Sequence, residues 1–162
     1  MPDPLREEVD AIRRRFTPEL VVGNPAHATL VYHDEADDPS LLRERLAEAT
    51  AAELPFELVL EGVRRFRAPA VGAYLSVRDP SGTVDRLRGR LLAPPFVPRR
   101  RLTLHVTLVH PAFAERLPAA WPSLSTLHFG RSFRVEALDL MSGDRSGVRF
   151  HSFALGARTP AA

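Results

Sequence analysis

The 162-residue sequence contains neither cysteine nor lysine. The absence of cysteine excludes a disulfide framework, a thiolate nucleophile and a zinc–cysteine site. The absence of lysine excludes Schiff-base chemistry and the lysine of a phosphate-binding loop. All 22 basic residues are therefore arginines, and the planar guanidinium group of arginine can bind two phosphate oxygens at once.

Long apolar runs are also missing, and no segment approaches the roughly 20 residues that a membrane-spanning helix needs. Residues 1–8 lack the apolar core of a signal peptide. The net charge of +2 is too small to indicate bulk nucleic-acid binding, and a hydrophobic fraction of 44% is ordinary for a globular protein. We therefore expect a globular cytoplasmic protein that is monomeric, with no membrane association and no obligate protein partner.

One five-residue pattern, His-x-Thr-Leu-Val, occurs twice. It spans residues 27–31, the first motif, and residues 105–109, the second motif. Both copies lie in apolar segments that are typical of strands. Because side chains alternate along a strand, His27 and Thr29 are expected on one face, and His105 and Thr107 likewise.

Apolar periodicity and turn signals predict an α+β protein. Helices are expected over residues 4–16, from 40 to about 49, over 81–92 and over 111–124. Strands are expected over 27–33, 56–66, 71–77, 102–110, 129–141 and 148–155, with a turn at 142–144.

The two halves of the chain follow the same order, helix-strand-helix-strand-strand. His105 follows His27 by nearly the same interval as Phe133 follows Phe56, which indicates a duplication. We expect a single domain over 1–162, made of two pseudo-symmetric lobes at about 1–79 and 80–158. Their antiparallel sheets would flank a central groove, with the helices outside and the two motif strands facing each other.

Two histidine–threonine pairs on one groove suit the chemistry of phosphate esters. Histidine titrates near neutral pH, so one imidazole can accept a proton from water or a ribose hydroxyl while the other donates one to the leaving oxygen. Threonine hydroxyls can donate hydrogen bonds to the non-bridging oxygens. Neither motif has the spacing of a metal clip, so no metal and no cofactor are expected.

The paired motifs, their placement in duplicated α+β halves and the chain length resemble the two-histidine (2H) phosphoesterases. The closest branch is that of the RNA 2′,3′-cyclic phosphodiesterases, also described as 2′-5′ RNA ligases. The resemblance covers nearly the whole chain. It implies a metal-independent reaction, without ATP, on 2′,3′-cyclic phosphates or 2′-5′ linkages of RNA ends or nucleotides, with a possible reverse ligation. It also implies that His27 and His105 form the acid–base pair, and that Thr29 and Thr107 hold the phosphate.

Four further residues are candidate substrate contacts. Tyr32 and Tyr74 offer aromatic rings for a base, His151 lies on a strand that would match the strand of Tyr74, and Arg101 ends a run of three arginines before the second motif. Each also has a purely structural interpretation, in the core or on the solvated surface. Two other functions stay open: a non-catalytic module that binds nucleotide or RNA ends, and a cyclic phosphodiesterase for a small non-RNA nucleotide such as a cyclic phosphate of ADP-ribose.

Overall fold

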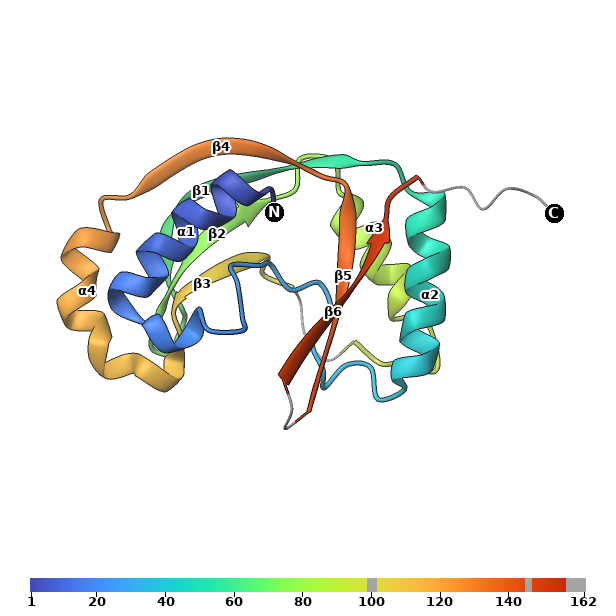
Figure 1. Ribbon diagram of the computed structural model, residues 1–162, viewed down its shortest axis with the longest axis horizontal. Coiled ribbons are helices and arrows are strands. Elements are labelled where there is room, and N and C mark those ends of the chain that lie inside the picture. The colour runs from blue at the N-terminus through green and yellow to red at the C-terminus, as the bar shows by residue number, and fades with distance from the viewer. Residues whose placement is uncertain (99–101, 145–146, 157–162) are drawn as a thin grey trace. The chain divides into compact units, whose positions relative to one another are not determined.

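The chain has an α+β fold in two compact units, seen in a computed structural model that describes residues 1–98, 102–144 and 147–156 (Figure 1). Each unit is built from three separate segments. Unit 1 comprises Met1–Thr29, Leu58–Arg78 and Leu104–Phe133, and unit 2 comprises Leu30–Glu57, Asp79–Thr103 and Arg134–Ala162. The units therefore do not coincide with the sequence halves 1–79 and 80–158, and the duplication stays a prediction.

Unit 1 is organised around a four-stranded sheet with the strand order β3-β2-β1-β4. The strands are β1 (Phe56–Arg65), β2 (Ala73–Arg78), β3 (His105–Val109) and β4 (His128–Val135). β2 pairs with β1 on one side and β3 on the other, antiparallel in both cases. Leu75 and Val106 lie opposite each other and are fully buried, so one face of the sheet forms the core of this unit.

Helical segments complete unit 1. They are α1 (Asp3–Phe16), η1 (Pro18–Leu20), η2 (Pro111–Arg116) and α4 (Leu117–Leu124). α1, blue in Figure 1, packs against β3. The guanidinium group of Arg116 in η2 donates hydrogen bonds to the Glu19 carboxylate of η1, and these bonds lower the pKa of Glu19 to about 2.

The buried face of α1 differs from the predicted apolar stripe of Leu5, Val9, Ile12 and Phe16. Val9 is fully buried, but the other residues that α1 buries are Asp10 and Arg13. A charged pair inside a helix face is exceptional because unpaired charges are costly to desolvate. Asp10 and Arg13 pair with each other, and their further partners are backbone groups just before the first motif.

Unit 2 consists of a helix pair and a hairpin. α2 (Pro39–Ala52) packs against α3 (Thr83–Leu91), and β5 (Ala137–Asp144) pairs antiparallel with β6 (Gly147–Ala154) (Figure 1). α2 begins where predicted because the Asp38 carboxylate accepts hydrogen bonds from the backbone N–H groups of Ser40 and Leu41 at 2.9 and 3.0 Å.

The predicted strand over residues 27–33 is wrong, since these residues form no strand. Neighbouring backbone groups bind side chains in place of a partner strand. Within unit 1 the Ala26 N–H donates to the Asp10 carboxylate at 3.0 Å, and within unit 2 the Leu30 carbonyl accepts a hydrogen bond from Arg88. With backbone groups satisfied in this way, an extended segment needs no sheet.

Two predictions near the C-terminus are also corrected. The single strand expected over 129–141 is two strands, β4 and β5, which belong to different sheets and are separated at Glu136. The turn expected at 142–144 is part of β5, because pairing with β6 continues as far as Asp144 and Gly147. Cross-strand pairing here overrides the local turn preference of Ser, Gly and Asp.

Candidate active site

The second motif occupies the whole of β3, which is shorter than the predicted strand over 102–110. His105 and Thr107 are half-buried on one face of the strand, while Val106 and Leu108 are buried on the other. The strand therefore presents an imidazole and a hydroxyl side by side on the open face of the sheet. This arrangement follows directly from the alternation of the sequence.

β2 supplies the neighbours of these two side chains. Ser76 lies opposite His105 and Tyr74 lies opposite Thr107. The Tyr74 ring centroid is 5.1 Å from that of His105, and the Phe66 ring meets His105 edge-on at 5.2 Å. Aromatic rings at such distances pack against an imidazole and restrict its orientation. Tyr74 is thus brought to the second motif, although its contact with a substrate stays a prediction.

Phe66 is absent from the predicted site residues, and a glycine explains its position. A Cβ atom on Gly72 would lie 2.4 Å from the Val109 carbonyl oxygen and 3.0 Å from the Phe66 ring. Only glycine permits so close an approach of the chain to the end of β3. The Phe66 N–H donates to the Gly72 carbonyl at 3.2 Å, which completes the support of the ring beside His105.

The first motif lies in the irregular segment after α1. The His27 side chain is exposed, and its Nδ1 lies 2.8 Å from the Pro25 carbonyl oxygen. A carbonyl oxygen only accepts hydrogen bonds, so Nδ1 carries the proton in this contact. In the neutral imidazole Nε2 is then the unprotonated nitrogen, the one that can accept a proton from a reactant.

The buried pair of α1 holds this segment in place. Asp10, 5% exposed, accepts the Ala26 N–H with both carboxylate oxygens at 3.0 and 3.1 Å. Arg13, 3% exposed, lies 2.6 Å from Asp10 and donates to the carbonyls of Asn24 (3.0 Å) and Leu20 (3.3 Å). Side chains of α1 therefore fix the backbone that precedes His27, at Ala26, Asn24 and Leu20.

α1 is also joined to the second motif. Thr17 directly follows the helix and is fully buried, and its hydroxyl donates to the Leu108 carbonyl of β3 at 2.9 Å. Asp10, Arg13 and Thr17 recur at the helical spacing of one face. Both motif histidines belong to unit 1, where α1 and the residue that follows it bind the backbone at each motif segment.

The comparisons with known proteins identify the family of this chain. The family model described as the 2′-5′ RNA ligase superfamily matches residues 1–147. The chain belongs to this superfamily of two-histidine phosphoesterases. Membership supports a phosphoesterase-type activity. A search of the curated proteins found no match.

A solved structure shows the same fold for this 2H phosphoesterase. The crystal structure of TT0787 from Thermus thermophilus superposes with a TM-score of 0.64. The two sequences are 16% identical, and the match covers 98% of this chain and 96% of the other. At this level of identity the likeness concerns the architecture alone.

Three further residues of the 2H phosphoesterase are predicted substrate contacts. Tyr32 and His151 belong to unit 2, where His151 is exposed on β6 opposite Leu140. Arg101 lies outside the described residues. Their contacts with a substrate stay predictions.

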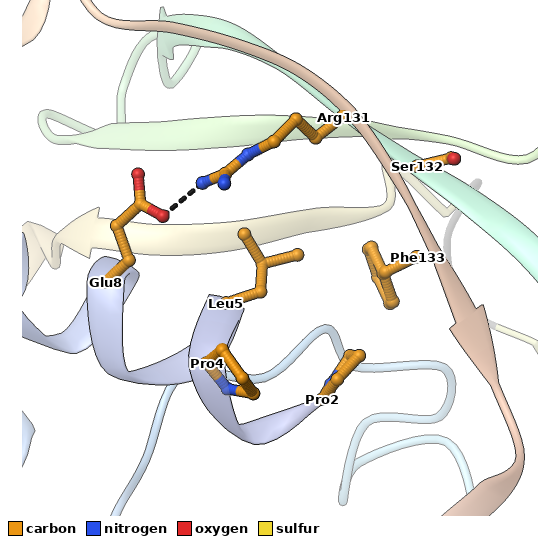
Figure 2. A pocket seen from close by; sticks show the side chains of 7 residues that line it. All are labelled: Pro2, Pro4, Leu5, Glu8, Arg131, Ser132 and Phe133. Atoms are coloured by element: carbon orange, nitrogen blue, oxygen red, sulfur yellow. Dashed lines mark hydrogen bonds and ion pairs between the residues drawn. The ribbon is translucent and has the colours of Figure 1, made fainter.

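A separate hollow of unit 1 contains none of the predicted residues. It measures about 270 Å³ and is lined by the start of α1 and by β4 (Figure 2), namely Pro2, Pro4, Leu5, Glu8, Arg131, Ser132 and Phe133. The Glu8 carboxylate and the Arg131 guanidinium group point toward each other and form an ion pair there (Figure 2). Among the residues that the structure describes, no cluster of histidine and acidic side chains has the form of a metal site, and no helix is long and apolar enough to cross a bilayer.

Proposed function

We propose that this 2H phosphoesterase hydrolyses 2′,3′-cyclic phosphates or 2′-5′ phosphodiesters of nucleotides or RNA ends, without a metal ion. The observation that carries the proposal is the anchoring of two His-x-Thr segments, in one compact unit, to α1 and to the residue that directly follows it. Chemistry by two histidines needs both imidazoles held at fixed positions, and shared attachment to α1 supplies that constraint.

The proposed reaction divides proton transfer between the two histidines. For a 2′,3′-cyclic phosphate, one neutral imidazole removes a proton from water as the water oxygen attacks phosphorus. The other imidazole, protonated, donates its proton to the ribose oxygen as the bond from that oxygen to phosphorus breaks. The products are a ribose hydroxyl and a phosphate monoester, and the two histidines have exchanged protonation states.

His27 is suited to either of these roles through Nε2. The hydrogen bond from Nδ1 to the Pro25 carbonyl leaves Nε2 as the reactive nitrogen in both protonation states. The Thr29 and Thr107 hydroxyls donate to the non-bridging oxygens, where negative charge accumulates in the transition state. Tyr74 and Phe66 orient His105 and offer an aromatic surface to the sugar or base.

The direct test is hydrolysis of a substrate panel by protein treated with a chelator. We expect turnover of a nucleoside 2′,3′-cyclic phosphate or of a 2′-5′ dinucleotide in EDTA at the rate seen without EDTA, because proton transfer by histidines replaces a metal-bound water. Activity that disappears in EDTA and returns with a divalent cation would contradict the metal-independent scheme. A cyclic nucleotide that binds but stays intact would identify a binding module.

The anchoring of the first motif by α1 leads to a second expectation. Asp10→Asn keeps the size of the side chain but no longer neutralises Arg13, so residues 24–27 lose their fixed position. We expect kcat to fall roughly 10- to 100-fold, since displacements of about 1 Å have effects of this order. The KM should change little, because the phosphate-binding threonines are retained. The kcat is measured well below the unfolding temperature of the variant, so that only folded protein is compared.

The same helix offers a matched control for this variant. Asp3 and Arg6 form an ion pair of the same spacing and the same 2.6 Å length, but it is exposed to solvent. Asp3→Asn should leave both kcat and stability nearly unchanged. If folded Asp10→Asn protein has the wild-type kcat, Asp10 stabilises the unit without positioning His27.

A further inference from the structure

One row of side chains crosses the sheet of unit 1 on the face that bears the second motif. Arg64 of β1 lies opposite Tyr74 of β2, which lies opposite Thr107 of β3. Residues directly opposite each other in antiparallel strands project from the same face. The next row along, with Leu75 and Val106, is buried on the other face. Arg64 therefore shares the open face with the hydroxyl that is proposed to hold the phosphate.

Arg64 differs from Arg78, an arginine of β2 on the same face, in having no carboxylate partner among the described residues. Arg78 donates through Nε to Glu61 at 2.8 Å, and Ser76 donates to the same carboxylate at 3.4 Å. The Arg64 side chain is exposed, and within the described residues it takes part in no hydrogen bond or ion pair. Its guanidinium group is thus available to an anion, whereas that of Arg78 is already engaged.

The spacing of the strands sets the distance across the sheet between Arg64 and Thr107. Neighbouring strands are about 4.8 Å apart, so the Cα atoms of Arg64 and Thr107 are separated by about 10 Å. The Tyr74 side chain lies between them. A ligand that spans the row would place one phosphate at Thr107, a sugar or base against Tyr74 and a second phosphate at Arg64. The span of this row is close to the length of one nucleotide.

We propose that Arg64 forms an anion subsite for a second phosphate, carried on the 5′ oxygen of the same ribose that bears the cyclic phosphate. The subsite rests on the proposed function and narrows its substrate class. A guanidinium group binds two oxygens of such a phosphate in a forked geometry, which lysine does not reproduce. Two kinds of molecule carry this phosphate: an RNA end, as a phosphodiester, and a sugar nucleotide, as a pyrophosphate.

A matched ligand pair tests the subsite. The ligands are a nucleoside 2′,3′-cyclic phosphate and the same compound with a 5′-phosphate. We expect the wild-type protein to have the higher kcat/KM for the 5′-phosphorylated ligand. Arg64→Gln should lower kcat/KM for that ligand roughly tenfold and change it for the other ligand by no more than about twofold. Arg64→Lys should retain part of the preference.

The adjacent residue is the matched control. Arg65 follows Arg64 on the same strand but projects from the opposite face, where its guanidinium group lies 4.1 Å from the centroid of the Trp121 ring. Arg65→Gln should affect both ligands equally. Added salt should reduce the wild-type preference for the 5′-phosphate and leave Arg64→Gln unaffected, because an exposed charge pair is screened.

The possible outcomes separate the subsite from the reaction itself. Equal loss on both ligands in Arg64→Gln, or equal effects of Arg64→Gln and Arg65→Gln, would overturn the subsite and leave the phosphodiesterase assignment intact. Should the wild-type protein hydrolyse neither of these ligands nor a 2′-5′ dinucleotide, the proposed function fails. Calorimetric titration with a nucleoside 3′-phosphate and a nucleoside 3′,5′-bisphosphate then decides the subsite. Tighter binding of the bisphosphate that Arg64→Gln abolishes supports it, and equal affinities overturn it.

The source of the second phosphate follows from two further substrates. A dinucleotide that ends in a cyclic phosphate presents a phosphodiester to Arg64, and a cyclic phosphate of ADP-ribose presents a pyrophosphate. The substrate whose kcat/KM depends more strongly on Arg64 identifies the source. If Arg64→Gln leaves kcat/KM unchanged for both substrates, the subsite is overturned.

Discussion

His27→Ala and His105→Ala should each reduce kcat for a 2′,3′-cyclic nucleotide by roughly 10²- to 10⁴-fold, the range that general acid–base catalysis contributes. In the proposed reaction, each substitution removes one of the two proton transfers. Because the two histidines act in one step, the double variant should lose little beyond either single variant. The wild-type pH–rate profile should be bell-shaped, since one imidazole must be neutral and the other protonated.

A third histidine provides the control for these variants. His33 is exposed and belongs to unit 2, so His33→Ala should keep the wild-type kcat. Initial rates at substrate saturation, measured from acid to alkaline pH, test which histidines form the acid–base pair. Full activity in either His27→Ala or His105→Ala would show that the residue is not part of the acid–base pair.

The largest expected effect on stability comes from Glu35 in unit 2. Glu35 is 3% exposed and Arg88 is 7% exposed, and their side chains meet through two contacts of 2.5 and 3.0 Å. Glu35→Ala leaves a buried guanidinium charge that the carboxylate no longer neutralises, which typically lowers the free energy of unfolding by about 3–5 kcal/mol. The change also removes the acceptor of the Tyr32 N–H. Urea unfolding followed by circular dichroism measures the loss.

A paired substitution separates the charge from the packing. Glu35→Leu combined with Arg88→Met replaces both charges with apolar side chains and should cost much less than Glu35→Ala alone, because no buried charge remains. A double variant as unstable as Glu35→Ala would mean that the shape of the ion pair, and not its charge balance, stabilises unit 2.

The elements predicted best are those whose signals are local. α2 begins where an aspartate and a proline precede a helical sequence, and the Asp38 carboxylate caps it. β3 shows the predicted alternation because the apolar side chains of Val106 and Leu108 are buried on one face. The polar side chains of His105 and Thr107 lie on the other face. The sequence alone therefore places His105 and Thr107 together on one face.

The parts that the sequence does not reveal depend on non-local partners. Asp10 is a buried carboxylate only because the Ala26 N–H reaches it, and no local pattern indicates such a contact. Phe66 lies beside His105 through the register of β2 against β3 and the close approach of Gly72. The first motif itself has the composition of a strand, but side-chain hydrogen bonds to its neighbouring backbone groups take the place of a sheet.

The bond between Thr17 and Leu108 also bears on the order in which the protein folds. The contact of Asp10 with Ala26 spans 16 residues and can form as soon as Ala26 has left the ribosome, whereas that of Thr17 with Leu108 spans 91. Contacts of high sequence separation form late because a long loop must first be closed. During synthesis the first motif can therefore take up its anchored conformation alone. The second motif is positioned only when β3 has docked, so the nascent chain stays inactive until then.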